Sequence, residues 1–495
     1  MKTLSIRQKR ACCSVALLFF LPIIAQAQLI SVRSVPVAAT EQFLVVPSQN
    51  LGMGGASIAY DDPSLDPFVN PAKGGRLRGA YLFSAPVFGN ITENNGGVRT
   101  LPMGALLGSA KWFGGMSLAV QQLSGPEPPD FTGWRTTIDV ARNSSSLLAD
   151  QNKNNLYAAG LLGTKFGRTG ISLAASFSWA GLEAMHGVDF LYGNSTRIEQ
   201  SGHIIDYRIG LLREKSRQPS FELLLLHNRI HMTHDVYYNR WVWEGFSVDI
   251  VRNLDQTHTW GLHLGSMVPF GRNDSRFGLI FTTNYKTHPK IPNYELMNIP
   301  RDPGETWAFN FGAGLSLDND SSVVAMDLIF EPIWSHTWAD AAERVPTRRG
   351  VIIPAGGKTV ENYFRFDNFL ARVGVSLEDN KTFSFQMGLQ ARFIKYRLKQ
   401  TNFVNDTRRS QKEFWAEWTP SIGFRLNFSS IQVRYTGRLT AGTGQPGVES
   451  RGFLETAADR SSNFLIAPSG SLTLQEAVVL THQISFVVAL HAITP

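Results

Sequence analysis

The chain has 495 residues, of which 43% are apolar, and its mean hydropathy is −0.10. Its only cysteines, Cys12 and Cys13, lie in the first 27 residues, so loss of that segment excludes disulfide scaffolds and cysteine zinc sites. The same loss leaves 43 Lys and Arg against 40 Asp and Glu, and this near balance does not favour a nucleic-acid partner.

The first segment has the features of a secretory signal. Four basic residues among the first ten positions precede an apolar run over Val15–Ile24, and the small-residue site Ala25-Gln26-Ala27 follows. A run of about ten residues is shorter than the roughly 20 that cross a bilayer as a helix, which disfavours an uncleaved anchor. We therefore predict that residues 1–27 are a cleaved signal peptide.

Residues 28–77 differ from the rest of the chain because they show no long alternation. Three glycines permit close packing and positive φ, and three prolines disfavour strand pairing. The glycines are Gly52, Gly54 and Gly55, and the prolines are Pro63, Pro67 and Pro71. This part predicts an N-terminal extension with a small plug, or hatch, on the periplasmic side of the first strand.

Residues 78–495 repeat an apolar–polar alternation with a period of two. Clear examples are Ile171–Trp179, Trp307–Leu317 and Phe383–Phe393. Each covers nine residues or more, which is the length that a tilted strand needs to cross a bilayer. Strands of a soluble β-sandwich are usually five or six residues long, so this alternative is less favoured. No apolar stretch after residue 28 reaches 18 residues, so helical spans are not expected.

The connections between these strips are unequal. Tight turns are expected at 114–115, 167–170, 214–219, 271–274, 318–320, 378–380 and 429–430. Long polar segments are expected at 124–155, 239–256, 340–361 and 442–475. Seven hairpins, a first strand over 79–88 and a closing strand over 478–490 make 16 strands. We predict an all-β, transmembrane, antiparallel outer-membrane barrel of 14–16 strands with a periplasmic-side hatch.

Five arginines fall on the polar, lumen-facing phase of the last third of the barrel: Arg372, Arg392, Arg425, Arg434 and Arg438. One interpretation is an electropositive wall that attracts the carboxylate of an amphiphile. The favoured interpretation is that they pair with acids of neighbouring strands or with hatch residues Asp61, Asp62 and Asp66, because charges in a barrel interior need partners.

Two other local patterns are explained without assigning them a function. At Phe393-Ile394 the apolar phase flips, which indicates either a bulge or, as we favour, a strand that has left the membrane. His227 and His231 share a strand face about 13 Å apart, too far to chelate one ion, and His234 points the other way. We therefore predict rim or surface histidines and no metal site.

No nucleophile elbow, zinc-binding pair or phosphate loop occurs in the chain. We accordingly expect no catalytic residues and no cofactor, and we predict that the protein is not an enzyme. A triad scattered over the outer rim of the barrel is the alternative, which we disfavour.

The start of the mature chain resembles a known family. Leu51-Gly52-x-Gly54-Gly55-Ala56, then Asp61-Asp62, then Asn70-Pro71-Ala72 directly before a barrel is similar to the N-terminal hatch of the FadL family, outer-membrane transporters of long-chain fatty acids and other hydrophobic compounds. The resemblance covers about 25 residues. It implies a 14-stranded barrel plugged by its own N-terminus, ligand capture by extracellular loops, passage controlled by the hatch, and a lateral opening in the wall.

The function expected from this resemblance is passive transport of hydrophobic small molecules, fatty acids first, across the bacterial outer membrane. The hatch residues expected to take part are Asn70, Pro71, Ala72, Gly52, Gly54, Gly55, Asp61 and Asp62. The expected partners are a hydrophobic ligand or lipid, outer-membrane lipids and the barrel assembly machinery. The alternative is a shuttle or accessory barrel of a type-nine-like protein secretion system, to which a count of 16 strands is better suited.

Overall fold

The computed structural model describes residues 48–91, 97–124, 153–167, 169–183, 197–242, 245–271, 274–287, 304–319, 321–341, 343–378, 382–447 and 473–490. The predicted signal peptide and residues 28–47 lie outside these ranges, as do most of the predicted long segments 124–155 and 442–475. No helix within the described ranges is long and apolar enough to cross a membrane.

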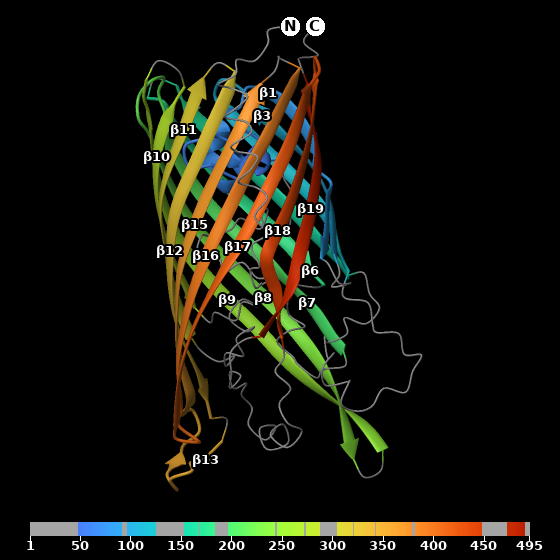
Figure 1. Cartoon of the computed structure of the whole chain (residues 1–495), viewed down its shortest axis with the longest axis vertical. Helices are drawn as coiled ribbons and strands as arrows, with labels where there is room; N and C mark the ends of the chain where they lie inside the picture. The colour runs from blue at the N-terminus through green and yellow to red at the C-terminus, as the bar shows by residue number, and fades with distance from the viewer. Residues whose placement is uncertain are drawn as a thin grey trace, which may run out of the picture.

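One antiparallel sheet forms almost the whole molecule and closes into a barrel (Figure 1). Consecutive strands pair with each other around the barrel, and the last strand pairs with the first. The strands of the wall are β1 (Gly79–Ser84), β2 (Val87–Ile91), β3 (Gly97–Gly108), β4 (Trp112–Ser124), β5 (Lys153–Phe166), β6 (Ile171–Leu182), β7 (Arg197–Arg213), β8 (Ser220–Val242), β9 (Gly245–Pro269), β10 (Arg276–Thr287), β11 (Gly304–Asn319), β12 (Ser322–Asp340), β15 (Lys358–Glu378), β16 (Phe383–Asn402), β17 (Thr407–Asn427), β18 (Ile431–Gly447) and β19 (Thr473–Leu490). A separate hairpin joins β13 (Val345–Pro346) to β14 (Ile352–Ile353).

The first strand of the barrel is interrupted. Both β1 and β2 lie between β19 and β3, and the break falls at Ala85-Pro86, where proline has no N–H for the ladder. The register continues across the break, because Ser84 pairs with Phe486 and Val87 with Gln483. Counted as one strand, β1 and β2 complete a barrel of 16 strands, which confirms the hairpin count and corrects the 14 strands that the family resemblance implies.

The short connections lie at one end of the barrel, together with the start of β1 and the end of β19 (Figure 1). One predicted turn is misplaced: Gly114 and Gly115 belong to β4, and the turn lies at residues 109–111, where Ser109 N donates to Trp112 O at 2.8 Å. The glycines serve packing instead, since a Cβ at Gly115 would lie 2.6 Å from Leu106 Cδ2.

The predicted loop over residues 239–256 is also wrong. There β8 and β9 continue as a long hairpin, which Figure 1 shows extending beyond most of the other strands at the end opposite the short connections. An alternation is present here, because Val248, Ile250 and Leu254 are apolar and exposed. It is easily missed because Arg252 interrupts it and the polar, Trp-bearing residues 239–245 precede it.

The outward face of the barrel is apolar along the periplasmic part of its strands. Large apolar side chains are exposed there, including Met103, Leu162, Ile209, Leu279 and Phe311. So large a continuous apolar surface is unfavourable in contact with water but favourable in contact with lipid chains. A closed barrel with this face, short turns on one side and long hairpins on the other is that of a bacterial outer-membrane protein.

The alternation at Phe393-Ile394 continues without a bulge, because the pairing of β16 with β15 and β17 is unbroken. The outward residue after Phe393 is Lys395, and the inward residue is the buried Ile394. The apolar phase therefore flips because the strand leaves the membrane, as predicted.

Candidate functional site at the plug

Residues 48–77, here called the plug, lie inside the barrel at the end that carries the short turns (Figure 1). The plug contains η1 (Leu51–Met53), α3 (Asp66–Val69) and η2 (Pro71–Arg76). One side of it, at η2, contacts the wall at β3–β7, and the other, at η1, contacts β15–β18. It thereby joins opposite parts of the wall.

Glycines on both sides make the contact between plug and wall close. Gly54 and Gly55 have φ of 69° and 77°, and a Cβ at Gly54 would lie 2.8 Å from Leu389 O. On the wall, a Cβ at Gly374 would lie 2.5 Å from Met53 Cα. The wall glycines that face the plug in this way are Gly210, Gly278, Gly312, Gly314, Gly374, Gly388 and Gly423. Backbone approaches backbone here, which only residues without a side chain allow.

Two polar wall residues hold the glycine-rich part of the plug. The Ser421 hydroxyl of β17 donates to Gly52 O at 3.1 Å and accepts from Gly54 N at 3.0 Å. The Asp327 carboxylate of β12 accepts from Ser57 N at 2.7 Å and Ile58 N at 3.2 Å. These bonds satisfy buried backbone donors that the irregular plug leaves unpaired.

Asp62 organises the plug itself. Its carboxylate accepts from Ser48 Oγ at 2.6 Å, Gln49 N at 2.7 Å and Leu65 N at 3.2 Å, and the residue is 1% exposed. Burial raises the pKa of Asp62 although these donors and the charge of Arg434 act to lower it. Asp62 therefore ties the start of the plug to the residues before α3.

Asp61, by contrast, connects the plug to the wall. It accepts from Arg76 Nη1 at 2.6 Å and forms an ion pair with Arg276 of β10. Arg76 also donates twice to Glu214, beside the β7–β8 turn, at 2.9 Å each. Burial acts to raise the pKa of Asp61, but the charges of Arg76, Lys73 and Arg276 prevail and lower it.

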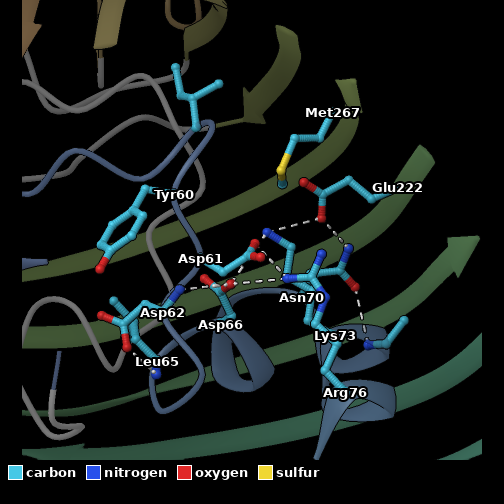
Figure 2. A network of polar contacts seen from close by, with 12 residues as sticks. Tyr60, Asp61, Asp62, Leu65, Asp66, Asn70, Lys73, Arg76, Glu222 and Met267 are labelled. Carbon is cyan, nitrogen blue, oxygen red and sulfur yellow. Dashed lines mark hydrogen bonds and ion pairs between the residues drawn. The ribbon is translucent and has the colours of Figure 1, made fainter. Parts of the chain in front are cut away.

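A second link joins Asn70 and Lys73 to Glu222 of β8 (Figure 2). Glu222 Oε2 accepts from Asn70 Nδ2 at 2.9 Å and lies 3.3 Å from Lys73 Nζ. Asn70 Oδ1 accepts from Ala72 N at 3.2 Å, so the same side chain caps η2, in which Pro71 is the first residue. Asn70-Pro71-Ala72 thus combines a helix cap with a contact to the wall.

Asp66 lies between these two links. Its Oδ2 is 3.8 Å from Lys73 Nζ and 3.6 Å from Arg76 Nη1. Burial raises the pKa of Asp66 to about 7, and the charge of Asp61 adds to this rise against the opposing charges of Lys73 and Arg76. The charge of this network therefore changes near neutral pH.

The predicted lumen arginines mostly pair with the wall. Arg372 lies 3.8 Å from Asp327, Arg392 lies 3.6 Å from Glu331, and Arg425 forms an ion pair with Glu378. Arg434 is 8% exposed, and its positive charge acts to lower the pKa of Asp62. Arg438 also has an interaction partner. Arg372 thus pairs with the adjacent strand β12, as predicted, whereas Arg392 and Arg425 pair with acids two strands away, on β12 and β15.

The cations that bind the hatch acids Asp61 and Asp66 are instead Lys73, Arg76 and Arg276, and sequence reasoning missed all three. It also missed the wall acids Glu214, Glu222 and Asp327. A usable signal was the series of glycines on the lumen phase of the strands, because these positions mark where another backbone approaches.

The histidines of β8 are divided between the two faces. The outward-facing His227 ring stacks on Trp260 with centroids 4.0 Å apart, and His231 lies beside His203 at 5.4 Å. His234 is fully buried, so its predicted place at the rim or surface is wrong; the strand continues and turns this residue inward. The described residues contain no group of three side chains suited to a metal ion.

An apolar track runs up the lumen from the plug. Phe68 of the plug packs edge to face on Phe83, with centroids 6.0 Å apart. The same buried cluster continues over β3–β8 through Leu106, Phe113, Leu161, Tyr157, Leu182, Ile204 and Met232. Large buried apolar side chains also lie on β12, β15 and β16, among them Ile333, Phe366 and Ile394, and buried polar side chains such as Asn310 and Asn362 lie between them. The lumen wall is therefore amphipathic, with apolar and polar side chains intermixed.

No protein-family model and no curated sequence matches the chain. Among solved structures, a FadL homologue of Pseudomonas aeruginosa is 10% identical over 90% of this chain and 99% of its own, with a TM-score of 0.42. The toluene transporter TodX of Pseudomonas putida is 10% identical over 89% and 97%, at 0.39. CdiB from Acinetobacter baumannii is 10% identical over 83% of this chain but only 60% of its own length, at 0.40. Similarity at this level extends to the barrel fold alone.

Proposed function

We propose that the protein is an outer-membrane transporter of hydrophobic small molecules, long-chain fatty acids among them, and that the plug gates its periplasmic end. The observation that carries the proposal is the apolar lumen track that ends on Phe68 of a plug held to the wall largely by polar contacts.

The amphipathic lumen suits an amphiphilic ligand. An apolar chain that lies along the track gains about 25 cal/mol for each Å² withdrawn from water. The polar side chains of the lumen wall and the lumen arginines offer hydrogen-bond donors to a carboxylate headgroup. Transport of this kind is passive, because the ligand moves down its own gradient.

The attachment of the plug suits a gate. The contacts of Asp61, Asn70 and Lys73 with the wall are ion pairs and hydrogen bonds, which water can replace when the plug moves. None of the strand pairs of the wall depends on these contacts, so the barrel stays closed while the plug shifts.

The test is native mass spectrometry with lipid extraction on barrel purified in a detergent that does not resemble a lipid, together with uptake of a fluorescent fatty acid into proteoliposomes. We expect wild-type protein to carry an amphiphile and to support uptake. Asn70→Ala should change both, whereas Asn402→Ala, which removes a capping contact to Asn405 N far from the plug, should change neither. An empty barrel without uptake contradicts the proposal.

A second candidate is a shuttle of a type-nine-like secretion system. The count of 16 strands and the long β8–β9 hairpin favour it, because both provide a wider mouth and a larger surface for a protein. A barrel that retains a secreted protein and no amphiphile in the same experiment would support this function instead.

A further inference from the structure

The outward face of β15, β16 and β17 changes from apolar to cationic along one line. On β16 the outward residues from Phe383 to Phe393 are apolar, and those that follow are Lys395, Arg397 and Lys399. The apolar part spans eleven residues, the length of a membrane-crossing strand. Aromatic rings mark its end, with Phe393 6.4 Å from Phe369 and 6.3 Å from Phe414, centroid to centroid.

Directly beyond these rings lie five cations on three adjacent strands. The register places Arg365 opposite Arg397 and Arg397 opposite Lys412, and it places Lys395 and Lys399 on either side of Arg397 along β16. We call these five residues, Arg365, Lys395, Arg397, Lys399 and Lys412, the cationic patch.

One carboxylate lies within the cationic patch. Asp367 accepts from Arg365 Nε at 2.9 Å and from Arg397 Nη2 at 2.6 Å, which fixes both guanidinium groups. Among the described side chains, no acid pairs with Lys395, Lys399 or Lys412. The patch therefore retains an excess of positive charge, and its members are exposed or, for Arg397, 36% exposed.

We propose that the cationic patch binds the phosphate groups of a phosphorylated lipid of the outer leaflet, of the lipopolysaccharide type. The acyl chains of such a lipid would lie on the apolar band below Phe369, Phe393 and Phe414, and its phosphates would then reach the height of the patch. Arg and Lys bind phosphate through charge-assisted hydrogen bonds, and clusters of four to eight such residues beside a membrane-spanning segment are suited to anionic headgroups. The proposal is independent of what the lumen transports.

The test uses the full-length protein in detergent and measures binding of lipid A, of dephosphorylated lipid A, and of inositol hexakisphosphate as a soluble phosphate. The variant is Lys395→Gln/Lys399→Gln/Lys412→Gln, which leaves the Asp367 pairs intact. The control is Lys111→Gln/Lys215→Gln/Arg217→Gln, which removes the same charge from exposed residues at the short-turn end. Heat-modifiable migration on gels confirms that each variant is folded.

We expect wild-type protein and the control to bind lipid A equally. The variant should bind it about 100-fold more weakly, because each cation near an anionic membrane surface strengthens binding about fivefold. Wild-type protein should bind dephosphorylated lipid A more weakly than lipid A by a similar factor. Added salt should weaken binding of lipid A by wild-type protein. Equal binding by the variant, or equal binding of the dephosphorylated lipid, would overturn the proposal. Complete competition by inositol hexakisphosphate at equal concentration would also overturn it, by assigning the patch to free phosphates.

Discussion

Replacing Glu222 with Gln tests whether polar contacts hold the plug in the lumen. Glu222 and Lys73 are 13% and 12% exposed, and their charged atoms lie 3.3 Å apart. Gln retains an oxygen that can accept from Asn70, but it leaves Lys73 with only Asp66 at 3.8 Å. The variant therefore removes the charge of this link and little of its volume.

The expected magnitude follows from the burial of the pair. Breaking a buried ion pair by removing one partner costs about 3–5 kcal/mol. Because Asp66 still compensates part of the Lys73 charge, the lower limit applies, and about 3 kcal/mol corresponds to a change of about 100-fold in an equilibrium constant. We expect the equilibrium between seated and displaced plug to shift by this factor.

Amide hydrogen exchange measures that equilibrium directly. Gly54 N and Ser57 N donate to the wall residues Ser421 and Asp327, so their exchange reports separation of plug and wall. Both amides should exchange about 100-fold faster in Glu222→Gln, and the variant should show more frequent open events in planar-bilayer recordings.

The matched control is Glu361→Gln. Glu361 is 16% exposed and accepts from Lys358 and His336 within the wall, away from the plug. It should leave exchange at Gly54 and Ser57 unchanged. If Glu222→Gln also leaves them unchanged in a folded barrel, the ion pairs do not hold the plug and the reasoning is refuted.

Two further predictions concern packing and pH. Gly374→Ala places a methyl group 2.5 Å from Met53 Cα. Because such overpacking costs about 1–3 kcal/mol, this variant should speed hydrogen exchange of the plug amides about tenfold. Gly160→Ala, where no atom lies nearer than 3.9 Å, should leave that exchange unchanged. The pKa of Asp66 is about 7 in the seated plug, above its ordinary value of 3.8, so the seated plug binds this proton more tightly than a displaced one. The equilibrium that keeps the plug seated should therefore weaken as pH rises from about 4 to 7 and then stay constant. Amide hydrogen exchange of the plug, corrected for its intrinsic pH dependence, measures this change. If the same pH dependence persists in Asp66→Asn, another group causes it.

Much of the architecture was predictable because its signals are local. An alternation with a period of two identifies the lipid-crossing strips, and polar or glycine-rich turns separate them. The sequence therefore limited the count to 14–16 strands, and the structure has 16. The plug was recognisable in the same way, because Gly52, Gly54 and Gly55 and three prolines interrupt any regular pattern. Prediction failed where the alternation is short and interrupted, as by Arg252 within residues 239–256.

The sequence by itself therefore determined the barrel, a strand number within 14–16 and an irregular segment before the first strand. Only the tertiary structure decided which wall residues hold that plug. Glu222, Asp327 and Ser421 lie 152, 270 and 367 positions from the plug residues they contact. Nothing in their own strands distinguishes them from other lumen-facing polar residues, because the period of a strand sets which face a side chain takes but not the height at which another segment meets it. That height is set by the closure of the barrel around the plug.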